Sequence, residues 1–158
     1  MSNTTSAERV DQASRIILAT PKAIYQAMLD AEALASWRPP AGMTARFERF
    51  DARLGGGYRM VLTYPEAQRG QGKTRDDVDV VEGRFVELDP FERIVEEVRF
   101  ESDDPAFAGV MRVATQLTAV ADGTKVTIRC ENVPPGISPE DHQDGMASTL
   151  RNLANFIE

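Results

Sequence analysis

The sequence has one cysteine and one histidine among its 158 residues. Cys130 has no second thiol with which to form an internal disulfide, and a cysteine-rich zinc site is excluded for the same reason. His142 is equally alone, whereas metal sites need several His, Cys or carboxylate ligands at short spacing. We therefore expect a protein without a bound metal or cofactor.

Long apolar runs and an excess of positive charge are also missing. No run approaches the roughly 18–20 residues of a membrane-spanning helix. The first twelve residues, MSNTTSAERVDQ, lack the charged and apolar regions of a signal peptide. Nucleic acids and anionic membranes attract clustered Lys and Arg, but this chain has 25 acidic residues and only 18 basic ones. These absences predict a cytoplasmic protein that binds neither nucleic acid nor membrane, and leave monomer and homodimer both open.

What the sequence does contain is a series of short strands. Apolar residues make up 42% of the chain and charged residues 27%, which are ordinary values for one packed domain. We expect residues 1–12 to be loose and residues 13–158 to form that domain. Two short helices are predicted after Thr20, the second at 31–37. Strands separated by Gly, Pro and Asp turns are predicted at 13–19, from 44, from 58, and at 78–88, 94–100, 109–119 and 125–132.

The C-terminal segment predicts how these strands are covered. Ser138 is a candidate N-cap for a helix, and His142 lies in its first turns. One turn after His142, the same side of this helix carries apolar residues at i, i+4, i+7 and i+11, namely Met146, Leu150, Leu153 and Ile157. One helix must then cover a large antiparallel sheet. A single helix on a strongly curved sheet seldom fills the space beneath it, so the sequence predicts an α+β fold with an internal pocket.

Several motifs occur in the order in which one known superfamily has them. They are TPKAIYQAMLDAEALASWRPPAG (20–42), FDARLGGGYRM (50–60), EGRFVELDPFERIVEEV (82–98), DGTKVTI (122–128) and HQDGM (142–146). In these motifs the chain resembles the helix-grip fold of the START-like (SRPBCC) superfamily, in particular the family similar to activator of Hsp90 ATPase homologue 1. The resemblance implies a curved antiparallel sheet of about seven strands, two short helices after the first strand and a long C-terminal helix packed across the sheet.

The resemblance implies several functions, because members of this superfamily share an architecture but include ligand carriers, co-chaperone domains, cyclases and resistance proteins. We favour binding of a small hydrophobic or amphipathic molecule between the curved sheet and the C-terminal helix. A second reading is a protein-interaction module that contacts a chaperone. A third is a cavity enzyme of cyclase or hydrolase type, with His142 and Glu96 as acid and base.

The ligand-binding residues are predicted from the inward strand faces and the helix stripe. Apolar side chains would line the walls, while Tyr58, Glu96 and His142 would supply the polar groups. No residue is assigned a catalytic role in the favoured reading. The full predicted set is Trp37, Phe47, Tyr58, Met60, Phe85, Glu96, Val98, Met111, Val113, Cys130, His142, Met146 and Leu150.

Glu96 and His142 each have a plain structural interpretation beside the functional one. In IVEEVRF, Glu96 alternates with Ile94 and Val98 and so shares their face of the strand. An inward carboxylate would orient a ligand or move a proton; alternatively it forms a salt bridge to an arginine, or a bulge turns it outward. His142 would be a general base, a polar handle for a ligand, or a first-turn residue bonded to a neighbouring carbonyl.

The segment 67–74, AQRGQGKT, is close to a phosphate-binding loop. Ala67 stands where the first glycine belongs, however, and the strand-like DVDVV follows where the motif needs a helix. We therefore interpret the segment as a hairpin loop rather than a nucleotide site. The acidic groups at 76–79 and 103–104 are interpreted as solvated turns.

Overall fold

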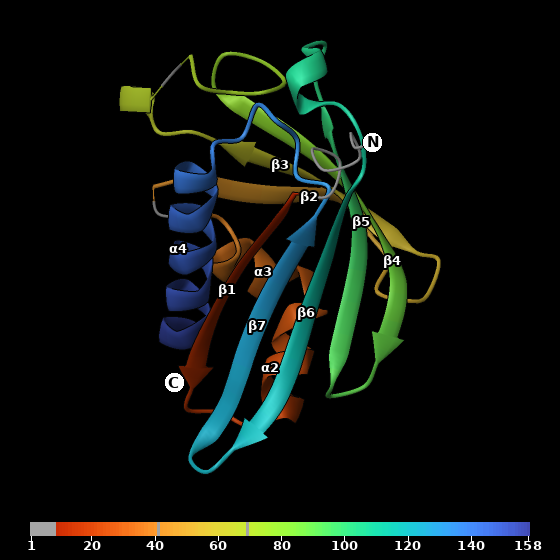
Figure 1. Cartoon of the computed structure of the whole chain (residues 1–158), viewed down its shortest axis with the longest axis vertical. Coiled ribbons are helices and arrows are strands. Elements are labelled where there is room, and N and C mark those ends of the chain that lie inside the picture. Colours follow the sequence, from red (N-terminus) through yellow and green to blue (C-terminus); the bar gives the residue numbers. More distant parts are fainter. Residues whose placement is uncertain (1–8, 41, 69) are drawn as a thin grey trace, which may run out of the picture.

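The computed structural model describes residues 9–40, 42–68 and 70–158. Its order is one strand, two helices, six strands and a closing helix, as predicted from the sequence (Figure 1). The elements are β1 (Val10–Ile17), α2 (Pro21–Met28), α3 (Ala31–Trp37), β2 (Thr44–Phe50), β3 (Gly57–Thr63), the 3-10 turn η1 (Glu66–Gln68), β4 (Val78–Asp89), β5 (Arg93–Glu101), the 3-10 turn η2 (Pro105–Phe107), β6 (Met111–Val120), β7 (Gly123–Glu131) and α4 (Pro139–Ile157).

The first strand begins earlier than the sequence suggested. β1 starts at Val10, so residues 10–12, which were expected to be loose, pair with β7 instead. Asp11 lies opposite Cys130 in that pairing. Residues 1–8 of the segment expected to be loose lie outside the described residues.

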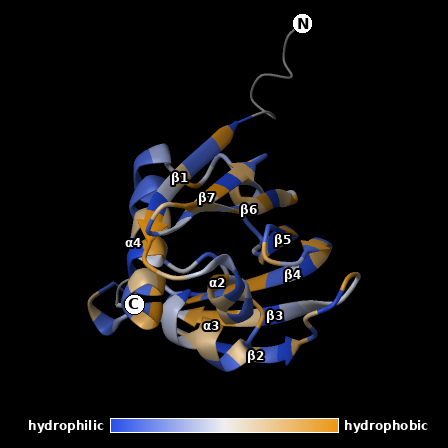
Figure 2. Ribbon diagram, turned by 90° about the horizontal axis from the view of Figure 1, so that it is seen from below, coloured by the Kyte–Doolittle hydropathy of each residue, from blue (hydrophilic) through white to orange (hydrophobic). Residues whose placement is uncertain are grey.

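All seven strands form one antiparallel sheet in the order β1-β7-β6-β5-β4-β3-β2. Strands β2 to β7 are a meander, and β1 joins the free side of β7. The register shifts between Phe47 and Arg49 and between Phe85 and Glu87, and such irregularities sharpen the local bend of a sheet. Seen from below, the strands follow a curve around α2 and α3, with α4 beside β1 (Figure 2). This is the helix-grip architecture.

The helices begin where local chemistry favours them. Thr20, Asp30 and Ser138 are the N-caps of α2, α3 and α4, and each side chain accepts a hydrogen bond from a backbone N–H three residues later. Proline occupies the first turn of α2 and of α4, where its missing N–H costs nothing. Trp37 then joins the two short helices, because its Nε1 donates to the carbonyl of Ala27 at 3.1 Å.

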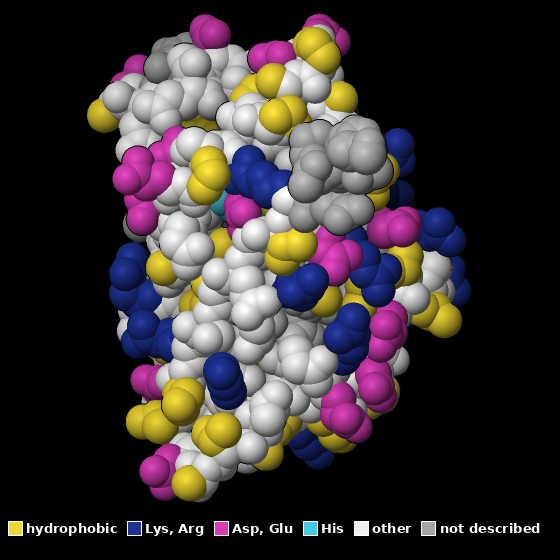
Figure 3. All heavy atoms as spheres, in the orientation of Figure 1, with side chains coloured by type: hydrophobic (Ala, Val, Ile, Leu, Met, Phe, Trp, Pro, Cys, Tyr) yellow, Lys and Arg dark blue, Asp and Glu magenta, His cyan; other side chains and the backbone are white. Residues whose placement is uncertain are grey.

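The main core lies between the concave face of the sheet and the helices. The stripe of α4 contributes Met146, Leu150 and Leu153, all buried. A small second cluster, Val61, Val78 and Val80, forms a separate group on β3 and β4. On the face shown in Figure 3, acidic and basic side chains are interspersed. Among the described residues, no helix is both long and apolar enough to cross a membrane.

Candidate functional site

A cavity of about 780 Å³ lies between the sheet and α4. Small-molecule sites in proteins range over roughly 300–1,000 Å³ and have mostly apolar walls with a few polar groups. Strands β3 to β7 form one wall, and α4 forms the other together with the ends of α2 and α3. Met60, Val98, Met111 and Ile128 are among the apolar side chains on the sheet side. The structure therefore has a pocket between the sheet and α4 whose volume lies in the range of small-molecule sites.

Nine of the thirteen residues predicted to bind a ligand line this cavity: Trp37, Met60, Glu96, Val98, Met111, Val113, Cys130, His142 and Met146. Phe47, Tyr58, Phe85 and Leu150 do not. The three aromatic residues pack on one another, with the Tyr58 ring 5.8 Å from the rings of both Phe47 and Phe85, while Leu150 is buried in the core. That the lining residues bind a ligand stays a prediction.

Three polar side chains meet at the inner wall of the cavity. The Tyr58 hydroxyl donates to Glu96 Oε1 at 2.5 Å, and Arg38 Nη2 donates to the same oxygen at 3.1 Å. Glu96 is only 2% exposed and Arg38 is 21% exposed. Glu96 shares the inward face of β5 with Ile94 and Val98. The inward position and the salt bridge to an arginine were considered above as alternatives, but in the structure Glu96 has both.

Arg38 reaches this point because its backbone is fixed at both ends. It is the C-cap residue of α3, where its N–H donates to Leu34, and its carbonyl accepts from Thr149 Oγ1 on α4 at 3.0 Å. The role of Arg38 could not be predicted from the sequence. Its position after Trp37 does not indicate that the end of α3 faces Glu96, a residue 58 positions further along the chain.

Burial and charge set the protonation of this group. Burial lowers the pKa of Arg38, but the charge and hydrogen bond of Glu96, together with the nearby Tyr58 and Cys130, outweigh it and raise the pKa of the guanidinium above its usual value. Burial raises the pKa of Tyr58; the nearby Arg38 opposes that rise and Glu96 adds to it. At neutral pH Arg38 is therefore a cation, and Tyr58 is a neutral phenol that donates its hydrogen bond to Glu96.

Gly83 provides the space that lets Tyr58 cross β4 to Glu96. Tyr58 on β3 pairs with Gly83 on β4, and a Cβ on Gly83 would lie 2.2 Å from Cζ of the Tyr58 ring. The ring is held by Phe47, Phe50 and Phe85, so it has little freedom to move aside. The glycine thus belongs to the site although it does not line the cavity beneath α4.

We expect Gly83→Ala to destabilise the fold by about 1–3 kcal/mol, the usual cost of overpacking a core. The matched control is Gly145→Ala in α4, where an added Cβ meets nothing within 4 Å. That change should stabilise the fold by about 0.5–1 kcal/mol through helix propensity. Urea unfolding of both variants checks this, and equal stabilities for the two would contradict the role of Gly83.

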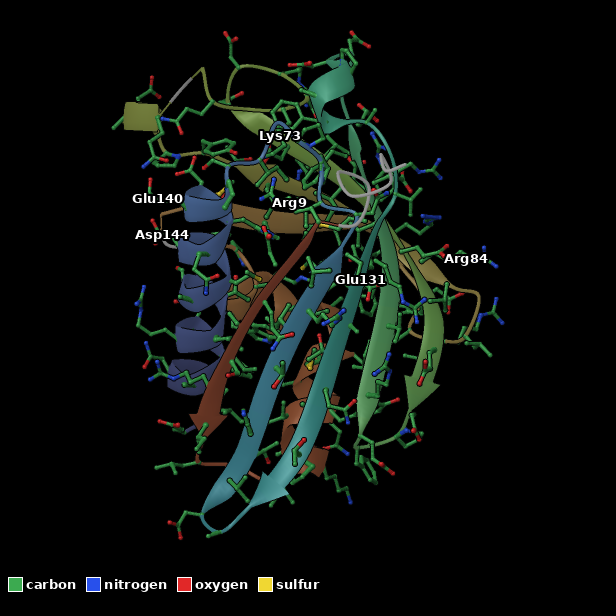
Figure 4. The ribbon with its side chains drawn as sticks, in the orientation of Figure 1. Arg9, Lys73, Arg84, Glu131, Glu140 and Asp144 are labelled. Atoms are coloured by element: carbon green, nitrogen blue, oxygen red, sulfur yellow. The ribbon has the colours of Figure 1, made fainter. Side chains whose placement is uncertain are left out.

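A second polar group lies nearer the loops that connect the strands. Lys73 Nζ is 3.0 Å from Asp79 Oδ2, and the Tyr64 hydroxyl donates to the same oxygen at 2.8 Å. The ammonium also lies 5.2 Å from the ring centre of Phe100 and 5.6 Å from that of Phe107. Figure 4 shows Lys73 beneath the loops at this end of the sheet, whereas Glu140 and Asp144 point outward from α4.

Lys73 and Asp79 bear on two sequence interpretations. Asp79 is 3% exposed, so its assignment to a solvated turn was wrong; its alternation with Val81 on the inward face of β4 was the available signal. Lys73 lies in the segment that connects β3 to β4, whereas a phosphate-binding loop connects a strand to a helix. Its ammonium also pairs with Asp79. This agrees with the loop interpretation of the segment 67–74, of which Arg69 lies outside the described residues.

The single histidine is held by a carboxylate from the first strand. His142 Nδ1 lies 2.7 Å from Asp11 Oδ2, and Arg9 contacts both oxygens of that carboxylate at 3.2 and 2.7 Å. The ring thus has a carboxylate partner rather than the neighbouring carbonyl considered above. Arg9 Nη1 also donates to the Ile137 carbonyl at 2.6 Å, which joins the start of β1 to the segment before α4. Sequence reasoning missed Asp11 because it assigned residues 1–12 to a loose segment.

We expect Asp11→Asn to lower the free energy of unfolding at pH 7 by about 1 kcal/mol, the usual contribution of partly exposed charged hydrogen bonds. The hydrogen bond from Arg9 lowers the pKa of Asp11; burial opposes this and His142 adds to it. Because the folded-state pKa is depressed, the stabilisation is present above the ordinary value of 3.8 and is lost as the pH falls through the folded-state pKa.

The variant should therefore lose less stability than the wild type when the pH falls from about 5 to 2. Thermal unfolding across that range measures the difference. Asp122→Asn is the control, because Asp122 lies in the β6–β7 hairpin turn, where asparagine is equally favoured before glycine. Parallel pH profiles for Asp11→Asn and the wild type would exclude the proposed role of this carboxylate.

Cys130 lines the cavity but is not suited to nucleophilic chemistry. Burial, reinforced by Asp11, raises the pKa of its thiol to about 12, with Arg38 acting in the opposite direction. The thiol is therefore protonated at neutral pH, and the thiolate is the reactive form. Within the described ranges, no three His, Cys, Asp or Glu side chains are grouped so as to hold a metal ion.

A seven-stranded antiparallel sheet curved around a cavity, with a C-terminal helix as its other wall, defines a helix-grip protein of the START-like (SRPBCC) superfamily, whose members generally bind ligands. The particular family follows from the sequence. Residues 18–158 match the family described as Activator of Hsp90 ATPase homolog 1-like protein, and the chain belongs to that family.

Solved structures share the fold of this chain. A protein from Chromobacterium violaceum is 32% identical, with a TM-score of 0.83 over 94% of this chain and 96% of that one. A protein from Rhodobacter sphaeroides is 21% identical, with a TM-score of 0.72 over 91% and 88% of the two chains. One from Nitrosomonas europaea is 19% identical, with a TM-score of 0.71 over 93% and 92%. The last two show the fold alone. No curated protein matches the chain.

Proposed function

We propose that this protein binds a small hydrophobic or amphipathic molecule in the cavity between the curved sheet and α4. The observation that carries the proposal is a space of about 780 Å³ whose wall is more apolar than polar, with Arg38, Glu96 and His142 among the polar side chains that border it. A solid interior would have left no room for a ligand. The family and its superfamily support the same function, since ligand binding is what their members generally do.

Binding would be driven by the apolar part of the ligand. Each methylene that leaves water for the cavity contributes about 0.8 kcal/mol. A chain of about ten carbons would thus offset the several kcal/mol lost when the ligand's free motion is restricted. The polar groups would fix the orientation, with Arg38 and Glu96 at the inner wall and Lys73 and His142 further along the cavity.

A cavity enzyme is the second candidate, and one observation favours it. His142 lines the cavity and is oriented by Asp11, which is how a general base is commonly held. Glu96, the other group in that hypothesis, is already engaged by Arg38 and Tyr58. We rank binding first because binding requires only the cavity, whereas catalysis would also require reacting side chains.

Native mass spectrometry of the protein purified from its own host tests the proposal. We expect a retained molecule of small mass that is released on unfolding. Copurification of a chaperone in equal amount, without a small molecule, would favour the protein-interaction alternative. An empty protein that also fails to bind simple amphiphiles would overturn ligand binding. Turnover of a bound compound, lost in His142→Ala, would favour the enzyme.

A further inference from the structure

The charged side chains in the interior of the cavity occur in opposite pairs. Among the described lining residues that are not exposed, the cations are Arg38 and Lys73, and the acids are Glu96 and Asp79. Arg38 pairs with Glu96 at 3.1 Å and Lys73 pairs with Asp79 at 3.0 Å. The remaining lining acids and base, Asp141, Asp144 and Arg151, are exposed on α4. The interior wall is therefore polar in places but has no net charge.

His142, also on the wall, lies beside a third pair of opposite charges. It contacts Asp11, whose carboxylate is already bound at both oxygens by Arg9. Arg9 and Asp11 thus place one cation and one carboxylate at this corner, 2.7 Å apart. No corner of the cavity interior, as far as the described residues show, offers a charge without its counter-charge.

This arrangement disfavours a ligand whose buried end is charged. A carboxylate next to Arg38 would also face Glu96, which lies 3.1 Å from the same guanidinium, so attraction and repulsion largely cancel. An ammonium group next to Glu96 would likewise face Arg38, so its attraction to the carboxylate and its repulsion by the guanidinium would largely cancel. The cost of removing either ion from water would then be uncompensated.

An uncharged donor fits the inner wall better. Both hydrogen bonds that the described residues give to the Glu96 side chain end at Oε1, so Oε2 can accept one from a ligand. A hydroxyl or amide N–H donates such a bond without bringing a charge into the cavity. A hydrogen bond to a carboxylate is also stronger than one between two neutral groups.

Given the proposed ligand-binding function, we infer that the ligand is electrically neutral at its buried end and donates a hydrogen bond from a hydroxyl or amide group to Glu96. The ligand class is neutral amphiphiles with one donor group at the end of an apolar body. Fatty acids and alkyl amines are excluded as preferred ligands.

Three probes with the same apolar chain test this in the wild-type protein: decan-1-ol, decanoate and decylammonium at pH 7. Trp37 is the only tryptophan in the sequence and lines the cavity, so its fluorescence reports binding. We expect decan-1-ol to bind at least about tenfold more tightly than either ion. If decanoate or decylammonium binds as tightly as decan-1-ol or more tightly, the inference about a neutral ligand is wrong but the proposed function stands. No binding of any probe overturns the proposed function with it.

Charge-neutralising variants provide the second test. Glu96→Gln removes the carboxylate and leaves Arg38 uncompensated, so the affinity for decanoate relative to decan-1-ol should rise at least about tenfold. Arg38→Gln should move the preference toward decylammonium instead. Glu97→Gln, one position along β5 and outside the cavity lining, is the matched control and should leave the ranking unchanged. An unchanged ranking in Glu96→Gln would contradict a donor contact at that carboxylate.

Discussion

Arg38→Met is expected to lower the free energy of unfolding by about 3–5 kcal/mol, which is the usual cost of removing one partner of a buried ion pair. Glu96 is 2% exposed, and Arg38 is the cation that contacts it among the described residues. Without the guanidinium, the carboxylate would keep only the hydrogen bond from Tyr58. Native domains are stable by only about 5–15 kcal/mol, so the loss would be a large part of the total.

Adding Glu96→Gln to Arg38→Met should restore about half of the lost stability or more, because glutamine removes the uncompensated charge. Its amide oxygen can still accept from the Tyr58 hydroxyl. The control is Arg84→Met on β4, an exposed arginine that points away from the molecule in Figure 4 and should change stability by less than about 0.5 kcal/mol. Urea unfolding measures all three. A double variant less stable than Arg38→Met would contradict this account.

Local patterns in the sequence were enough to predict the fold. Alternation in IVEEVRF placed Glu96 on the inward face of β5, and the spacing of Met146 and Leu150 placed the stripe of α4 against the core. The capping residue Ser138 and the Asp-Pro and Asp-Gly turns fixed the ends of elements to within a few residues. These features depend on residues close together in the chain, which is the range over which periodicity and capping act.

The partners of the polar side chains could not be predicted in the same way. Arg38 and Glu96 are 58 residues apart, and Asp11 and His142 are 131 residues apart. A strand pattern shows which face a carboxylate occupies but not which helix end or strand start will lie opposite. For the same reason the pattern could not show that the ring of Tyr58 would cross Gly83.

Packing between side chains also decided which inward residues reach the cavity. Phe47, Tyr58 and Phe85 are apolar or aromatic residues of the kind expected on its wall, yet they pack ring against ring and lie outside its lining. Their neighbours Met60 and Val98 line it instead. Membership of a strand face is thus a requirement for a ligand-binding residue, but the sizes of the neighbouring side chains determine which of them borders empty space.

The cavity itself is tested by filling it. Val113→Trp is expected to weaken binding of decan-1-ol by about 100-fold or more, because the added rings would occupy the space that the ligand needs. Val113 is buried on β6 and lines the cavity. The same substitution in a solid core would cost about 1–3 kcal/mol of stability through overpacking. Here about 780 Å³ is available, so stability should change by less than about 1 kcal/mol.

Thr118→Trp is the matched control, since Thr118 has nearly the size and shape of valine, lies on the same strand and is exposed. It should leave both binding and stability close to the wild-type values. Isothermal titration with decan-1-ol and urea unfolding measure the two effects separately, without relying on tryptophan fluorescence. Severe destabilisation by Val113→Trp would show that β6 faces a filled core. Full stability with undiminished binding would place the ligand elsewhere, because a cavity filled by an indole cannot also hold a decyl chain in the same position.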